Sequence, residues 1–315
     1  MRRQFVIATV IVAIVVLAVL MVPPIMSLAV EQQESDKKDM SCVYCNITGD
    51  SRNDLLVRVT TFDGDMPTIE IRAVNGSNGE ELWKSEKYPN CYADTHPVGD
   101  LNGDNKPDVL IVLGSCVDIT SGKGYGEVIG VKGCDGTKLW SKRIEGARNE
   151  AVRMFANPAN LTSANRTDVV VNTITYTLYG PKTKVMAING RDDGKVLWEK
   201  SVKTANSVFG VPVDIDNDGI DEVVMGMPEE MAKSLAPEGF YPMTSNVTVV
   251  NGNNGTEFWR DSKDYSDVAT FEPAGDLNGD GKNDLMVWIG CRNGGCKLEA
   301  LRGTNGEKLW AYEIE

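Results

Sequence analysis

Two short motifs alternate five times along this chain. The first is an acidic loop that leads into an apolar strand, and the second is a glycine turn that leads to a tryptophan. Full acidic loops begin at Asp100, Asp214 and Asp276, and partial ones begin at Asn46 and Asn160. The glycine turns end at Trp83, Trp140, Trp198, Trp259 and Trp310. Because self-similarity at a fixed period indicates a repeated supersecondary unit, the chain beyond about residue 40 should fold as five copies of one unit.

Each copy contains about 57 residues, which is enough for four strands of ordinary length and their turns. In the second copy we expect strands near residues 92–98, 109–113, 127–131 and 138–142. Short loops make neighbouring strands antiparallel, and Asn-Gly or Asp-Gly turns supply the positive φ that tight hairpins need. Four-stranded antiparallel units repeated in this way form the blades of a β-propeller. We therefore predict an all-β propeller of five blades, at residues 41–90, 91–147, 148–205, 206–266 and 267–315, with the repeated tryptophan on an outer strand between blades.

The first thirty residues have the pattern of a membrane anchor. Arg2 and Arg3 precede an uncharged apolar run from Phe5 to Val22, which as a helix would be about 27 Å long and would span a bilayer. The arginines should stay in the cytoplasm, so the propeller should lie outside. We predict an N-terminal transmembrane helix in residues 1–30 and a linker at 31–40. The alternative is a cleaved signal peptide, since small residues in 27–29 suit a peptidase, and the protein would then be secreted.

Sequons and cysteines agree with an extracytoplasmic location. The glycosylation candidates are Asn46, Asn75, Asn160, Asn165, Asn246 and Asn254. Cys291 and Cys296 flank a tight hairpin and are expected to form a disulfide. Cys42 and Cys45 are spaced as in a redox motif, but no βαβ pattern surrounds them, so a plain local disulfide is expected. The pairing of the other three cysteines stays open, and their odd number leaves at least one thiol free.

The three full acidic loops predict calcium sites. Calcium takes six to eight oxygen ligands, whereas zinc and copper prefer the histidine and cysteine that these loops lack. An EF-hand is excluded, because its twelfth-position glutamate is replaced by Ile111, Met225 and Val287. Three or four carboxylates so close together would repel one another without a cation. The predicted ligands, for about three structural Ca²⁺ ions, are Asp100, Asn102, Asp104, the carbonyl of Lys106 and Asp108; Asp214, Asp216, Asp218, the carbonyl of Ile220 and Glu222; and Asp276, Asn278, Asp280, the carbonyl of Lys282 and Asp284.

The two partial loops are weaker metal candidates. The loop at Asn46 keeps Asp50 and Asp54 but is otherwise neutral, and the loop at Asn160 has Ala164 where a ligand should stand. We expect the loop at Asn160 to hold no metal.

The motifs resemble two known groups of propellers. The acidic loops resemble the FG-GAP or VCBS-type repeats of integrin α-subunits, in which such a loop binds calcium at the edge of a blade. The glycine-turn segments resemble the tryptophan-docking repeats of quinoprotein (PQQ-dependent) propellers. Together the resemblances cover residues from about 41 to 315. The chain departs from both groups in having fewer blades, and it lacks the adjacent cysteine pair that quinoprotein enzymes carry over their cofactor.

The charge balance argues against nucleic acid as a partner. The chain has 32 Lys and Arg against 45 Asp and Glu, a net charge of -13, whereas phosphate binding needs an excess of base. His96 is the single histidine, and we expect it to be a buried, hydrogen-bonded structural residue. No catalytic group stands out, so we predict a non-enzymatic, membrane-anchored surface module that binds a protein or a cell-surface glycan through rim loops at 227–245 and 118–126.

Two enzymatic alternatives remain. A quinoprotein oxidoreductase with PQQ on the propeller axis would rest on the tryptophan repeats alone. A polysaccharide-acting enzyme would need a paired acid and base, which the sequence does not locate.

Overall fold

The computed structural model describes residues 38–64, 66–163, 166–178, 180–191, 193–203, 210–227, 246–261, 269–289 and 296–314. The chain divides into two compact units, Met1–Lys38 and Asp39–Glu315, and the second contains the sheets. The predicted anchor at residues 1–30 lies outside the described residues, and within them no helix is long and apolar enough to span a membrane. The predicted binding loop at 227–245 also lies almost wholly outside them.

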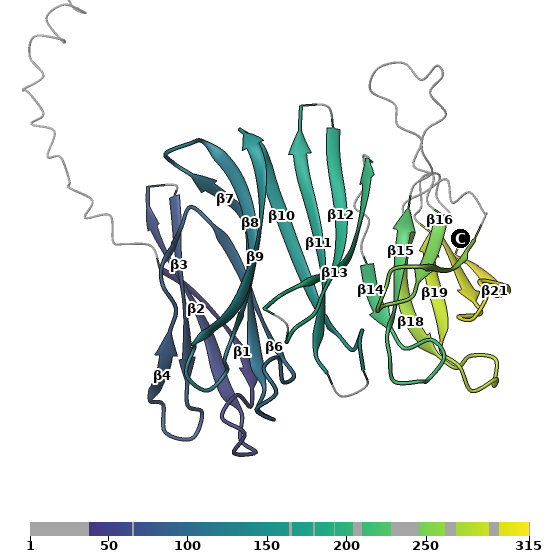
Figure 1. Ribbon diagram of the computed structural model, residues 1–315, viewed down its shortest axis with the longest axis horizontal. Coiled ribbons are helices and arrows are strands. Elements are labelled where there is room, and N and C mark those ends of the chain that lie inside the picture. The colour runs from purple at the N-terminus through teal and green to yellow at the C-terminus, as the bar shows by residue number, and fades with distance from the viewer. Residues whose placement is uncertain are drawn as a thin grey trace, which may run out of the picture. The chain divides into compact units, whose positions relative to one another are not determined.

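The described chain forms five antiparallel sheets that follow one another in chain order (Figure 1). Sheet 1 contains β1 (Lys38–Cys45), β2 (Asp54–Asp63), β3 (Met66–Val74) and β4 (Glu81–Lys84), with the short β5 (Tyr88–Pro89) paired to β3. Sheet 2 contains β6 (Tyr92–Val98), β7 (Asp108–Asp118), β8 (Lys123–Val131) and β9 (Lys138–Arg148). Sheet 3 contains β10 (Ala151–Ala159), β11 (Asp168–Thr177), β12 (Gly180–Ile188) and β13 (Val196–Lys203). Sheet 4 contains β14 (Gly210–Val213), β15 (Glu222–Met227), β16 (Asn246–Val250) and β17 (Glu257–Arg260). Sheet 5 contains β18 (Ala269–Gly275), β19 (Asp284–Ile289), β20 (Cys296–Leu301) and β21 (Lys308–Ile314).

The prediction of an all-β fold built from four-stranded antiparallel sheets is therefore confirmed. In sheet 2 the second hairpin is longer than expected, because its ladder continues through a register shift between Leu113 and Cys116. Only residues 119–122 join β7 to β8, so most of the rim loop predicted at 118–126 is strand.

Hydrophobic side chains fill the space between consecutive sheets. In the first of these cores, Leu56, Ile71 and Trp83 of sheet 1 pack with Val109 and Ile111 of sheet 2, and all five are buried. Three further clusters join sheet 2 to sheet 3, sheet 3 to sheet 4 and sheet 4 to sheet 5. Each inner sheet thus buries both of its faces against its neighbours, and this apolar burial is the main stabilising contribution.

A tryptophan on the last strand of each of the first four sheets docks onto the next sheet. Its indole N–H donates to the carbonyl of the first glycine in the following glycine turn, an arrangement that we call the tryptophan joint. The four hydrogen bonds are Trp83 to Gly133 at 2.6 Å, Trp140 to Gly190 at 2.7 Å, Trp198 to Gly252 at 2.7 Å and Trp259 to Gly303 at 2.5 Å. These four indoles are 5–9% exposed, so the prediction that the repeated tryptophan packs between sheets is confirmed for them.

Both glycines of a turn that receives a tryptophan are required, for different reasons. A Cβ on Gly190 would lie 2.1 Å from the carbonyl oxygen of Thr167, and a Cβ on Gly194 would lie 2.9 Å from the ring of Trp140. Gly194 also has a positive φ of 67°, which side chains disfavour. The first glycine is therefore required by the backbone of its own sheet, and the second by the tryptophan of the preceding sheet.

The cysteines are arranged differently from the expectation. Cys91 and Cys116 form a disulfide that joins the chain just before β6 to β7. The local disulfide expected between Cys42 and Cys45 is wrong: both thiols are free, and their odd spacing along β1 turns Cys42 to solvent and Cys45 to the core. The pair expected at Cys291 and Cys296 lies outside the described side chains.

Replacing Trp140 by Phe should lower the free energy of unfolding by about 2–4 kcal/mol, because it leaves the buried carbonyl of Gly190 without its donor and opens a cavity. Urea unfolding followed by circular dichroism measures this loss. The control Tyr44→Phe changes an exposed ring on β1 and should stay within about 0.5 kcal/mol of the wild type. Equal stability of the two variants would contradict the role given to the joint.

Candidate functional site

The ninth residue of every acidic loop is a buried carboxylate with a structural role. This residue accepts the backbone N–H of the loop's second residue, as when Asp108 accepts from Leu101 at 2.8 Å and Glu222 from Ile215 at 3.0 Å. In four loops it also accepts the N–H of the first glycine in the following turn. Those bonds join Asp54 to Gly76, Asp108 to Gly133, Asp168 to Gly190 and Asp284 to Gly303, at 3.0–3.1 Å.

Sequence reasoning assigned Asp108, Glu222 and Asp284 to metal and missed this second role. A signal was available, because Asp54 and Asp168 stand at the same place in the two loops that lack other ligands. All five carboxylates are at most 4% exposed, so each one ties its loop to its own sheet whether or not a cation is present.

In two of the full loops, burial and the neighbouring acids raise the pKa of this carboxylate. Burial raises the pKa of Glu222 to about 7, and the charges of Asp216 and Asp218 add to the rise. Burial likewise raises the pKa of Asp108 to about 6, with the charges of Asp104 and Asp100 adding to it. These two loops therefore hold like charges close enough to repel, and a bound cation would relieve that repulsion.

The loop at Asn46 behaves differently. Burial raises the pKa of Asp54, but the amide N–H groups of Gly76 and Thr48 lower it by more, and the net shift is downward. This partial loop therefore keeps its buried carboxylate charged by hydrogen bonding alone.

The loop of residues 214–222 brings three carboxylates together. Asp214, Asp216 and Asp218 each offer an oxygen, and these oxygens lie within 4.8 Å of one another. The amide of Asp218 donates to Asp214 Oδ1 at 3.1 Å, which curls the loop around the cluster. Oxygen ligands in a tight loop are the donor set that calcium prefers, so these residues fit that ion.

In the other two full loops, basic side chains lie against the outer acids. Arg191 lies 3.4 Å from Asp100, and Lys132 lies 3.1 Å from Asp104. In the third loop, Arg302 is 3.9 Å from Asp280. The other predicted ligands make hydrogen bonds within their loops. The side chains of Asn102 and Asn278 donate to the ninth-position carboxylates Asp108 and Asp284, and Asp276 accepts loop amides. The backbone amides of Lys106, Ile220 and Lys282 donate to the fifth-position acids of their loops.

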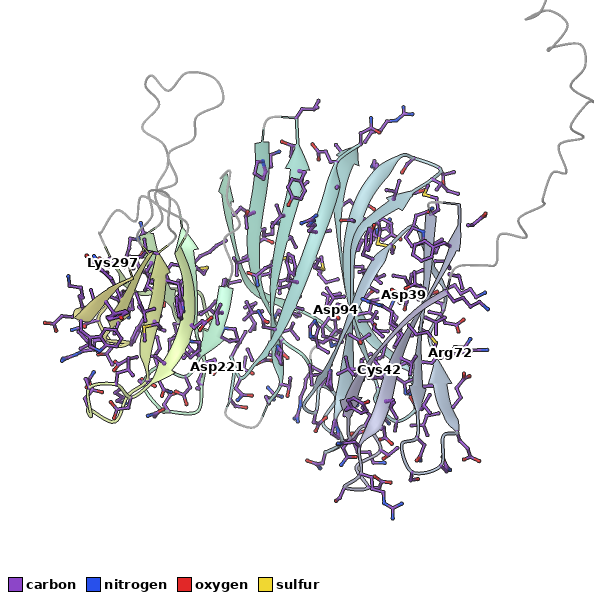
Figure 2. The ribbon with its side chains drawn as sticks, turned by 180° about the vertical axis from the view of Figure 1, so that it is seen from behind. Asp39, Cys42, Arg72, Asp94, Asp221 and Lys297 are labelled. Atoms are coloured by element: carbon purple, nitrogen blue, oxygen red, sulfur yellow. A yellow bond between two sulfur atoms is a disulfide. The ribbon has the colours of Figure 1, made fainter. Side chains whose placement is uncertain are left out.

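A separate pocket of about 430 Å³ opens between sheets 1, 2 and 3. Arg58 reaches it from β2, His96 and Asp94 from β6, and Arg153 with Phe155 from β10. The label of Asp94 in Figure 2 marks its place in the fold. Two arginines and one aspartate line the pocket, so its lining carries more basic than acidic side chains in a chain that is acidic as a whole. The guanidinium of Arg153 also lies over the ring of Tyr176, 5.6 Å from its centroid.

Hydrogen bonds fix part of the pocket wall. Arg58 Nη1 donates to the carbonyl of Ala93 at 2.7 Å, and His96 Nε2 lies 3.7 Å from Asp94 Oδ2. The expectation of a buried His96 is wrong: its side chain is 37% exposed, because β6 is an edge strand of its sheet and turns this residue into the pocket. This cavity could not be predicted from the sequence, because its residues come from three different sheets.

The sequons within the described side chains lie in loops and turns. Asn254 is exposed, and its Oδ1 accepts the hydroxyl of Thr256 at 2.7 Å. Asn75 accepts the hydroxyl of Ser77 in the equivalent turn of sheet 1. Asn46 and Asn160 are half-buried, while the side chains of Asn165 and Asn246 lie outside the described set.

Solved structures match the chain at low sequence identity. No protein-family model matches the chain, and no curated protein sequence matches it. Among solved structures, a rhamnogalacturonan lyase of Bacillus licheniformis matches with a TM-score of 0.56 and 15% identity, over 88% of this chain and 51% of the lyase. A quinohemoprotein alcohol dehydrogenase of Pseudomonas putida matches with a TM-score of 0.37 and 10% identity, over 86% of this chain and 57% of the dehydrogenase.

The chain thus spans about half the length of the lyase that it matches. At this identity the likeness shows the fold alone. Together with the five sheets, it identifies the described chain as a β-propeller-like, all-β fold.

Replacing Asp168 by Asn should destabilise the protein by about 3 kcal/mol, because an amide cannot accept all the hydrogen bonds that now converge on the carboxylate. Asp168 accepts from the amides of Leu161, Thr162 and Gly190 and from the Thr162 hydroxyl. Thermal unfolding with and without calcium measures the effect.

The expected loss is the same in both conditions, since this loop has Ala164 in place of a ligand. The control Asp63→Asn removes an exposed carboxylate at the end of β2 and should change little. A loss that disappears when calcium is added would contradict the structural role.

Proposed function

We propose that this protein is a non-enzymatic binding module: a calcium-stabilised, β-propeller-like array of five blades, held at the outer face of a membrane by its N-terminal segment, that binds the anionic part of a glycan or protein. The observation that carries the binding role is the positively charged pocket between sheets 1, 2 and 3. The calcium role rests on the acidic loops.

The pocket has the chemistry of an anion site. Arg58 and Arg153 offer planar guanidinium groups that suit a carboxylate or sulfate, and Tyr92 with Phe155 adds aromatic surface. A volume of about 430 Å³ lies in the range of small-ligand pockets, so the pocket could hold one residue of a longer glycan or polypeptide ligand. The name of the matching lyase says that it acts on rhamnogalacturonan, which makes a glycan the first ligand class to examine.

Calcium is supported by loop chemistry. The Asp214, Asp216 and Asp218 cluster supplies oxygen ligands. Burial is the main cause of the raised pKa of Glu222, and the charges of Asp216 and Asp218 add a repulsion that a divalent cation would remove. The loops at 100–108 and 276–284 have the same spacing of oxygen-bearing residues, and they would bind the other two of the three proposed ions. Their resemblance to FG-GAP or VCBS-type repeats points the same way.

An extracytoplasmic position is supported by the disulfide and by the N-terminal sequence. The Cys91–Cys116 bridge suits an oxidising compartment. The apolar run Phe5–Val22 after two arginines suits an anchor, with secretion after cleavage as the alternative.

The repeated tryptophans no longer favour the quinoprotein alternative. Trp83, Trp140, Trp198 and Trp259 are buried in joints between sheets, where each indole N–H is bonded to a glycine carbonyl. Packing accounts for these residues without a cofactor.

Calcium should raise the melting temperature of the full chain in detergent, and EGTA should lower it again, because the ions bind the folded loops only. Asp216→Asn should weaken this response, while Asp63→Asn should leave it intact. Differential scanning calorimetry measures both. A melting temperature that EGTA does not change would rule out structural calcium.

Acidic polysaccharides, such as a polyuronate, should bind the full chain more tightly than neutral dextran, and more weakly as salt is raised. Arg153→Gln should reduce the affinity at least tenfold in surface plasmon resonance, because one of the two arginines that line the pocket is lost. Arg52→Gln removes the same charge from an exposed loop and serves as the control. Equal binding by the two variants would move the binding site away from this pocket.

A further inference from the structure

Each sheet carries one row of side chains that ends in its tryptophan. The row runs straight across three hydrogen-bonded strands, so its members share a face. The rows are Leu56, Ala73 and Trp83; Leu110, Gly130 and Trp140; Val170, Ala187 and Trp198; Val224, Val249 and Trp259; and Met286, Ala300 and Trp310. In sheets 1 to 4 this face is covered by the next sheet, as the four core clusters show.

The same face of sheet 5 is uncovered among the described residues. Trp310 is 42% exposed, whereas its four counterparts are nearly buried, and its indole has no hydrogen bond within the described chain. Trp288 and Tyr312, which flank Leu298 in the neighbouring row, are exposed as well. Leu277, the second residue of its acidic loop, is 40% exposed, although the equivalent residue of every other loop is fully buried. Sheet 5 therefore presents the complete donor half of a tryptophan joint.

Sheet 1 presents the matching acceptor half. Its glycine turn contains Gly76 and Gly79, at the positions that receive the tryptophan in the other four sheets. The amide of Gly76 is already held by Asp54 at 3.1 Å, as in a finished joint. A Cβ on Gly79 would meet nothing within 4 Å among the described residues, whereas a Cβ on the equivalent Gly136 would lie 2.8 Å from the ring of Trp83.

Beside this turn, strand β2 of sheet 1 also presents apolar side chains that are incompletely covered. Leu55, Val57 and Val59 of β2 are half-buried, while Val109 and Ile111, their counterparts on β7, are fully buried. The two open faces are thus the two halves of one interface that the chain already builds four times.

We propose that sheet 5 of one copy of this protein docks on sheet 1 of a second copy through a fifth tryptophan joint. The indole of Trp310 donates to the carbonyl of Gly76, its ring lies over Gly79, and Leu277 packs beside it. The second copy is the occupant because it repeats the established interface with a tryptophan and two glycines at the same positions, while both halves are open among the described residues of one chain. The contact is head-to-tail, so its two sides are different surfaces.

Each of two substitutions should block one half of the proposed joint. Trp310→Ser removes the donor from an exposed position. Gly79→Asn blocks the acceptor, and asparagine tolerates its φ of 78°. Neither side chain meets a neighbour that would prevent folding, because Gly79 stands in open space and Trp310 is partly exposed. Leu178→Ser changes an exposed residue in the turn between β11 and β12 and serves as the control.

The experiment is sedimentation of the full chain in detergent over a hundredfold range of concentration. The wild type and Leu178→Ser should associate as concentration rises, and the two blocked variants should stay single. An equimolar mixture of the blocked variants should recover pairs, because one supplies an intact sheet 1 and the other an intact sheet 5.

Wild-type chain that stays single throughout would overturn the proposal, including the case in which Trp310 is buried by its own sheet 1. Association that survives both blocking substitutions would overturn it as well, and so would a mixture that recovers no pairs. Circular dichroism on each variant confirms that the sheets are formed.

Discussion

One type of hydrogen bond, between the indole N–H of a tryptophan and a glycine carbonyl of the next sheet, recurs between the sheets and aligns them, while apolar burial supplies most of the stability. In the middle of the chain, Asp168 holds the amide of Gly190, and the carbonyl of the same glycine accepts Trp140 from the preceding sheet. The glycine is irreplaceable because the carbonyl of Thr167 occupies the space of a side chain. Three residues from two sheets therefore fix the spacing and register of the sheets.

This joint explains why the two motifs alternate. In three of the four joints, the inner carboxylate of the acidic loop holds the amide of the acceptor glycine, as Asp108, Asp168 and Asp284 do. The outer carboxylates take no part in the joint. The loop at Asn160 illustrates the division, since it has Asp168 for the joint but has Ala164, which carries no carboxylate, at an outer position. Calcium would then add stability to loops that are already anchored by hydrogen bonds. The pocket of Arg58 and Arg153 is separate from these loops, because its lining residues lie on β2, β6, β7 and β10.

Local repetition allowed much of this to be predicted from the sequence. The turn glycines and the strand pattern predicted the sheets, and the equal placing of the tryptophans predicted their packing. The pocket at His96 and the Cys91–Cys116 bridge could not be predicted, because each depends on how distant strands come together. The expected bridge between Cys42 and Cys45 failed on strand geometry, since residues three apart on a strand point to opposite faces. The buried role of Asp108 was missed because its loop also reads as a metal site.

Exchange of the indole protons tests the joint most directly. In protein labelled with ¹⁵N-tryptophan, the indole N–H groups of Trp83, Trp140, Trp198 and Trp259 should exchange with deuterium only through global unfolding, because each is buried and bonded. Exchange of these four protons while the backbone amides of the central strands stay protected would show that the sheets hold together without the joint, and would contradict this account.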